Sequence, residues 1–153
     1  MRRNPIYFNA LAAGSAAAVT TTIAIAACGR SEDVSAWAPL NAISHIAWGD
    51  QAGAQVGPSW KYSATGIGLN ASAMLSWGVV YALLAGGNAR TTTRALAAGA
   101  ATAATAYVVD YHVVPKRLTP GFEKRLSREA MASIYASLAI GLALGGLMAS
   151  QRR

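Results

Sequence analysis

Two short stretches of this chain hold the side chains that most often do chemistry near neutral pH. Residues His45 to Asp50 read HIAWGD, and residues Asp110 to His112 read DYH. They contain both histidines and two of the six acids of the chain. Imidazole and carboxylate groups can relay a proton or bind a divalent cation. Together with an amide in an otherwise apolar stretch, they give a candidate polar site: His45, Asp50, Asn70, Asp110 and His112.

The DYH stretch also has a structural interpretation. On an ideal α-helix Asp110 and His112 stand about 200° apart, so they cannot share one ion. Asp110 follows a line of small residues that begins at Gly99, and it should therefore face a neighbouring helix. A carboxylate in that position needs a partner such as Lys116 or Arg117. On this interpretation the stretch forms a structural cluster at the end of a membrane helix.

Known catalytic motifs are missing from the sequence. There is no HExxH, no GxSxG and no glycine-rich phosphate loop, and no predicted span holds a pair of carboxylates. We therefore expect no catalytic residues, no cofactor and no bound metal.

The elements that must position these residues follow from composition. Hydrophobic residues make up 54% of the chain and charged residues only 12%, against roughly 25% charged residues in soluble domains. The charges fall in short clusters, and the segments between them can cross a bilayer core of about 30 Å. The lipid bilayer is therefore the expected partner. Four spans are predicted, at residues 5–28, 65–87, 93–114 and 130–149.

The loop between the first two spans predicts a short helix at residues 39–49. Pro39 stands near its start and Gly49 near its end, while Asn41, His45 and Trp48 share one face. Such a helix would lie in the interface or dip into the bundle. The predicted fold is an all-α integral membrane four-helix bundle with a short interfacial helix in the first loop, formed by a single domain over residues 1–153.

The last span carries small residues at four-residue spacing. In lipid, helices associate through close packing, so such residues mark contact faces. This stripe predicts either a tight bundle or a seam between identical copies, which would make a homo-oligomer. Its members are Ser133, Ser137, Gly141 and Gly145.

The charge distribution leaves the membrane orientation undecided. With both termini in the cytoplasm, six basic residues lie inside and seven outside, a split that does not separate the two orientations. The net charge of +7 indicates contact with head groups on both surfaces, and no nucleic-acid partner is expected. The six are Arg2, Arg3, Arg90, Arg94, Arg152 and Arg153.

The amino-terminal stretch allows a second interpretation. MRR followed by an apolar run that ends in IAAC resembles a bacterial lipoprotein signal, with Cys28 as the lipidated residue. The apolar run from Ile6 to Ala27 is longer than the roughly 7 to 15 residues of a signal core and has the length of a span. The span is therefore favoured, and a lipoprotein-like anchor processed at Cys28 is the alternative.

Two motifs carry a resemblance to a known group. NAISHIAWGDQA (Asn41 to Ala52) together with VVDYHVVPKRLTPGFEKRLS (Val108 to Ser127) resembles small uncharacterised bacterial inner-membrane proteins with four predicted spans. The resemblance implies an inner-membrane location and carries over no activity. Small multidrug-resistance transporters also have four short spans, but here the first span lacks their membrane-embedded glutamate.

The sequence supports two hypotheses for the function, from different classes. The first is a non-enzymatic membrane protein of structural or accessory type. The second is a small transporter or ion-handling protein that uses His45, Asn70 and Asp110 as its polar site.

Overall fold

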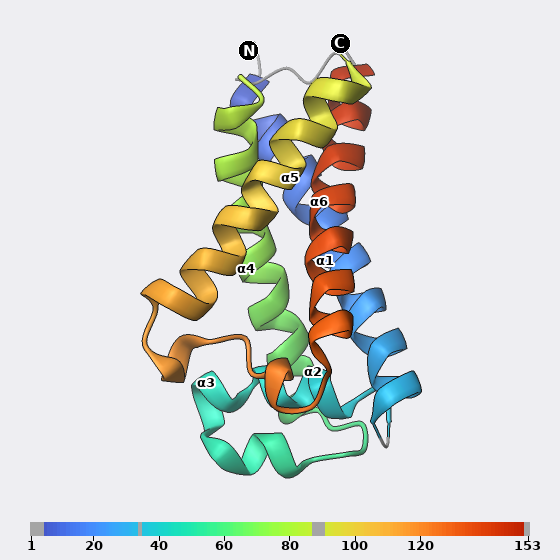
Figure 1. The fold of residues 1–153 in the computed structure, drawn as a ribbon, viewed down its shortest axis with the longest axis vertical. Coiled ribbons are helices and arrows are strands. Elements are labelled where there is room, and N and C mark those ends of the chain that lie inside the picture. The colour runs from blue at the N-terminus through green and yellow to red at the C-terminus, as the bar shows by residue number, and fades with distance from the viewer. Residues whose placement is uncertain (1–4, 34, 87–90, 152–153) are drawn as a thin grey trace. The chain divides into compact units, whose positions relative to one another are not determined.

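The computed structural model describes residues 5–33, 35–86 and 91–151, and every regular element within these ranges is helical (Figure 1). This confirms the predicted all-α class. Four helices are long: α1 (Pro5–Glu32), α4 (Tyr62–Leu84), α5 (Thr92–Val108) and α6 (Arg128–Gln151). The short elements are α2 (Ala38–Ile43), α3 (His45–Trp48), η1 (Asp50–Ala54), the π-helix η2 (Val109–Val113), η3 (Lys116–Leu118) and η4 (Phe122–Lys124).

Three of the long helices, α1, α4 and α6, are long and apolar enough to cross a membrane. They cover most of the predicted spans 5–28, 65–87 and 130–149. The predicted span 93–114 is not among them, because α5 has only 17 residues. The count of four spans therefore stays a prediction. Gly87, which ends one predicted span, lies outside the described residues, as do residues 2, 3, 90, 152 and 153 of the charge count.

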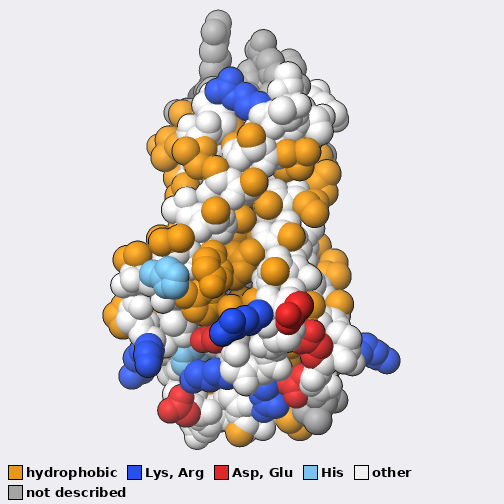
Figure 2. Space-filling view, viewed as in Figure 1, with side chains coloured by type: hydrophobic (Ala, Val, Ile, Leu, Met, Phe, Trp, Pro, Cys, Tyr) orange, Lys and Arg blue, Asp and Glu red, His pale blue; other side chains and the backbone are white. Residues whose placement is uncertain are grey.

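The chain divides into two compact units. Unit 1 comprises Met1–Thr21, Ala71–Ala106 and Tyr135–Arg153, and unit 2 comprises Thr22–Asn70 and Tyr107–Ile134. All four long helices contribute residues to both units. All six acids of the chain belong to unit 2 by their residue numbers. Figure 2 shows acidic side chains next to basic ones on the visible face.

Small side chains let the helices of unit 1 approach closely. Gly78 of α4 lies so near α1 that a Cβ on it would stand 2.8 Å from Gly14 Cα. A Cβ on Gly145 of α6 would stand 2.6 Å from Ala13 Cα. Both neighbours are backbone atoms, which cannot rotate away as a side chain can. The core between these helices is mostly alanine with a few larger residues: Ala13, Ala17, Met74, Tyr81, Ala85, Ala95, Ala98, Ala103, Ala106, Leu138, Leu142 and Ala143.

The small-residue stripe of α6 lies mainly against α1. Gly141 and Gly145 are both buried, and a Cβ on Gly141 would stand 2.6 Å from Ala17 Cα. The Thr20 hydroxyl of α1 donates a hydrogen bond to the Ser137 carbonyl of α6 at 2.9 Å. Ser133 belongs to unit 2 and is exposed. The part of the stripe that packs against α1 therefore begins at Ser137.

The loop helix expected at residues 39–49 is broken into two pieces. Ser44 ends α2 and begins α3, with φ −70° and ψ −2°. Its hydroxyl donates to the Asn41 carbonyl at 2.7 Å, and its N–H donates to the same carbonyl at 3.0 Å. Serine often bonds to a nearby carbonyl in this way, in competition with the helical ladder. Gly49, with φ +75°, ends α3 where the sequence predicted the helix to end.

The DYH stretch is not part of an ideal α-helix, so the angle of about 200° assumed for Asp110 and His112 is wrong. It lies in the π-helix η2, where the Val114 N–H bonds to the Val109 carbonyl, five residues back, at 3.0 Å. The helix then ends at Val114, whose ψ is 150°. The ring of Pro115 disfavours helical backbone in the residue before it. The predicted stop at Pro115 is thereby confirmed.

Candidate functional site

His45 is a buried polar residue of unit 2. Its side chain lies at the start of α3 and is 5% exposed. Gly121, with φ +92°, lies directly against the ring, and a Cβ on it would stand 2.6 Å from both His45 Nδ1 and the Ala42 carbonyl oxygen. Glycine therefore meets two demands here, a left-handed backbone and a close approach.

The hydrogen bond at Nδ1 shows which ring nitrogen of His45 carries a proton. Nδ1 lies 2.9 Å from the carbonyl oxygen of Ala42. A carbonyl oxygen can only accept, so Nδ1 must carry the proton and donate. In the neutral ring Nε2 is then a bare acceptor. Nε2 is buried and has no hydrogen-bond partner among the described residues. A buried acceptor without a partner costs about 1–3 kcal/mol, so the position favours a ligand that donates.

A pocket of about 400 Å³ opens beside this histidine. We call it the His45 pocket, and its lining residues are Ala42, His45, Asp50, Gly53, Ala54, Lys124 and Arg125. They come from α2, α3, η1 and the end of η4. The pocket therefore joins a carboxylate, two cationic groups and an imidazole acceptor from two segments more than 70 residues apart.

The two cations of the pocket differ in how firmly they are held. Lys124 Nζ lies 3.3 Å from Asp50 Oδ1, with side chains 52% and 94% exposed. Such exposed pairs contribute little to stability. Arg125 is more enclosed: NH1 lies 3.2 Å from an Asp33 carboxylate oxygen, and Nε donates to the Gly53 carbonyl at 2.9 Å. Arg125 therefore ties the segment after α1 to η1 and to the segment before α6.

A second polar anchor of unit 2 is Asn41. Asn41 is fully buried, and its Nδ2 donates to the carbonyls of Gln55 at 3.0 Å and Gly57 at 2.8 Å. Ser63 at the start of α4 donates to Asn41 Oδ1 at 2.6 Å. All of its polar atoms are satisfied, so Asn41 has a structural role and holds the loop after η1 in place.

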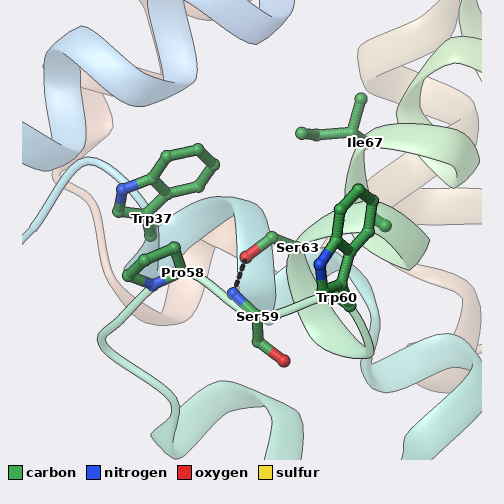
Figure 3. A pocket seen from close by; sticks show the side chains of 7 residues that line it. Trp37, Pro58, Ser59, Trp60, Ser63 and Ile67 are labelled. Atoms are coloured by element: carbon green, nitrogen blue, oxygen red, sulfur yellow. Dashed lines mark hydrogen bonds between the residues drawn. The ribbon is translucent and has the colours of Figure 1, made fainter.

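Aromatic residues gather at the start of α4. Trp48 Nε1 donates to Thr65 Oγ1 at 3.1 Å, and Lys61 Nζ stands 4.6 Å from the Trp48 ring centroid. A second pocket, of about 370 Å³, lies between Trp37 and Trp60 (Figure 3). Trp60 is 93% exposed. Tryptophan and lysine of this kind are typical of the membrane–water interface.

The structure brings together only part of the predicted polar site. His45 and Asp50 line the His45 pocket, whereas Asn70, Asp110 and His112 do not. Asn70 is buried and its Nδ2 donates to Thr22 Oγ1 at 3.1 Å. Asp110 is partly buried, and His112 is exposed with its ring edge-on to Tyr107 at 5.9 Å.

Metal ligands are sparse in the part of the chain that the structure describes, which contains no group of three His, Cys, Asp or Glu residues able to hold a metal ion. Arg125 and Asn41, which organise the site, were missed from sequence. Arg125 stands in a charged turn, and its partner Asp33 is 92 residues away. The apolar pattern of the sequence contains no signal for such a pairing.

Comparisons with protein-family models, with curated proteins and with solved structures found no match to this chain.

Proposed function

We propose that this chain is a multi-pass integral membrane protein of structural or accessory type. It would form a four-helix bundle in the bacterial inner membrane, as the resemblance of its two motifs implies. Helices α1, α4 and α6 are three of the spans, and α5 continued by η2 is the fourth.

Large apolar side chains that face outward support membrane insertion. They lie on the three most apolar helices, where a water-soluble bundle would carry polar residues. The visible surface accordingly carries many apolar side chains (Figure 2). Exposed members include Leu11, Val19, Ile23, Val79, Leu83, Ile140, Leu144 and Met148.

The observation that carries the fourth crossing is the position of Arg125. It binds Asp33, which follows α1, and the Gly53 carbonyl in η1. The segment before α6 and the loop between α1 and α4 must therefore lie on the same side of a membrane. If α4 crosses to the other side, the chain has to cross back before it reaches Arg125.

Helix α5 has the length for this return when η2 is included. Its 17 residues rise about 26 Å, short of a hydrocarbon core of about 30 Å. The 5 residues of η2 extend the helical path to Val113. Alanine, glycine and threonine make this span weakly apolar, so contact with neighbouring helices is important. A Cβ on Gly99 would press on the Ala139 carbonyl of α6.

A structural or accessory role is favoured by how polar groups in the spans are used. The Asn70 amide bonds to Thr22, and the Thr20 hydroxyl bonds to the Ser137 carbonyl. Hydrogen bonds of this kind between neighbouring helices hold membrane bundles together. These groups therefore stabilise helix contacts.

The unpartnered Nε2 of His45 favours a second candidate, a small transporter or ion-handling protein. On this proposal His45 would act together with Asn70 and Asp110, which lie outside the His45 pocket. Reconstituted liposomes should then pass protons or cations, and Asp110→Asn should abolish the flux. Flux equal to that of protein-free liposomes would exclude this function and leave the accessory role.

Membrane insertion is tested by alkaline extraction of membranes that contain the protein. Carbonate at high pH removes peripheral proteins, and we expect this chain to remain in the pellet and to dissolve only in detergent. The size of the detergent-solubilised protein then shows whether copies associate. Release into the carbonate supernatant would contradict the proposal.

A further inference from the structure

We propose that the His45 pocket binds a phosphoethanolamine group, with the primary ammonium at His45 and Asp50 and the phosphate at Lys124 and Arg125. Where the ligand is the head group of a membrane lipid, this inference rests on the proposed membrane function. The proposal assigns a ligand class to a pocket in which His45 Nε2 has no hydrogen-bond partner among the described residues and Lys124 and Asp50 are held only by an exposed ion pair.

The ammonium end follows from the acceptors of the pocket. The Nδ1–H of His45 is used by the Ala42 carbonyl, so in the neutral ring the buried Nε2 is an acceptor. Asp50 adds a carboxylate that is 94% exposed and held by one exposed lysine. A primary ammonium carries three N–H donors, which is enough to supply one to each acceptor. A quaternary choline ammonium has no N–H and cannot.

The phosphate end follows from the two cations. Lys124 is held only by an exposed ion pair, which exchanges at small cost. Arg125 makes four contacts with Asp33 and Gly53, while a guanidinium has five N–H donors. At least one donor is left for an anionic oxygen. Charge-assisted bonds to phosphate are among the strongest that arginine makes.

The size and position of the pocket fit a head group. At about 400 Å³ it is much larger than one water, whose share of liquid volume is about 30 Å³. Its lining residues follow α1 and precede α4 or α6 in the chain, so they come from the segments that connect apolar helices. Such segments lie at head-group depth when the helices span a bilayer.

The test uses the purified full chain and matched lipids. Native mass spectrometry would compare binding of phosphatidylethanolamine and phosphatidylcholine with identical acyl chains. We expect the ethanolamine lipid to bind about tenfold more tightly, as the loss of one charge-assisted bond predicts. Equal binding of the two lipids would overturn the proposal.

Three variants locate the site. His45→Asn keeps an N–H donor close to the Nδ1 position and removes Nε2, so it should reduce the preference for the ethanolamine lipid over the choline lipid. Asp50→Asn removes the carboxylate charge and should also reduce this preference. Lys61→Gln removes a cation outside the pocket and should leave it unchanged. Helix content by circular dichroism checks folding, and a well-folded His45→Asn variant with full preference would contradict the assignment.

Soluble phosphoethanolamine distinguishes the two sources of the ligand. If it competes with the lipid and binds alone with similar affinity, the pocket recognises the free compound. If only the lipid binds, the ligand is the membrane head group. Carbonate extraction is independent of either result, so a chain that leaves the membrane but binds phosphoethanolamine would refute the proposed function and keep this site. Binding of neither form would refute the site.

Discussion

Replacing Gly145 by alanine should loosen the contact between α6 and α1. The added Cβ would stand 2.6 Å from Ala13 Cα and would also press on the Ala12 carbonyl. These are backbone atoms, so relief requires movement of a helix. Overpacking of this kind costs about 1–3 kcal/mol. Alanine also favours the helix over glycine by about 1 kcal/mol. This gain partly offsets the packing cost, so a control variant with the same gain is needed.

Gly68→Ala provides the matched control. Gly68 lies within α4, is exposed, and a Cβ on it meets nothing within 4 Å. Both variants gain the same propensity, so the difference between their unfolding free energies isolates the contact at Gly145. We expect Gly145→Ala to be less stable than Gly68→Ala by about 1–3 kcal/mol. Denaturation by SDS in mild detergent, followed by circular dichroism, measures both, and equal stability would refute the packing described for α1 and α6.

Three further predictions concern charges and processing. Arg125→Lys cannot keep both the carboxylate and carbonyl contacts and should lower the unfolding free energy by about 1–3 kcal/mol. Lys124→Gln changes an exposed pair and should alter the unfolding free energy little. The SDS titration described above measures both variants. Asp110→Asn should destabilise the protein more than His112→Gln, because Asp110 is partly buried and His112 is exposed; equal effects would contradict this. Intact mass should show an unmodified chain, and a species beginning at Cys28 with added acyl mass would establish the lipoprotein alternative.

The sequence predicted those parts of the fold that depend on local composition. Apolar length predicted α1, α4 and α6, and Pro115 and Gly49 marked helix ends through backbone restrictions that act within one or two residues. The break at Ser44 was missed, because serine is compatible with both a helix and a turn. Which one forms depends on the packing of neighbouring elements.

The candidate site was predicted only where its residues are close in sequence. His45 and Asp50, five positions apart, line one pocket. Asn70 and Asp110 were grouped with them by residue type, but the distances between helices that decide such a grouping are not encoded in apolar spacing. Arg125 was missed for the same reason, since its contacts with Asp33 and Gly53 join segments 92 and 72 residues apart.

Cysteine labelling from each side of the membrane measures the number of crossings. In a Cys28→Ser background, single cysteines at Gln51, Thr91 and Lys116 lie at exposed positions in η1, before α5 and in η3. A membrane-impermeant maleimide applied to one side of sealed vesicles should label Gln51→Cys and Lys116→Cys together, and Thr91→Cys only from the opposite side. Labelling of Lys116→Cys from the same side as Thr91→Cys would show that α5 does not cross, and would contradict the four-helix bundle.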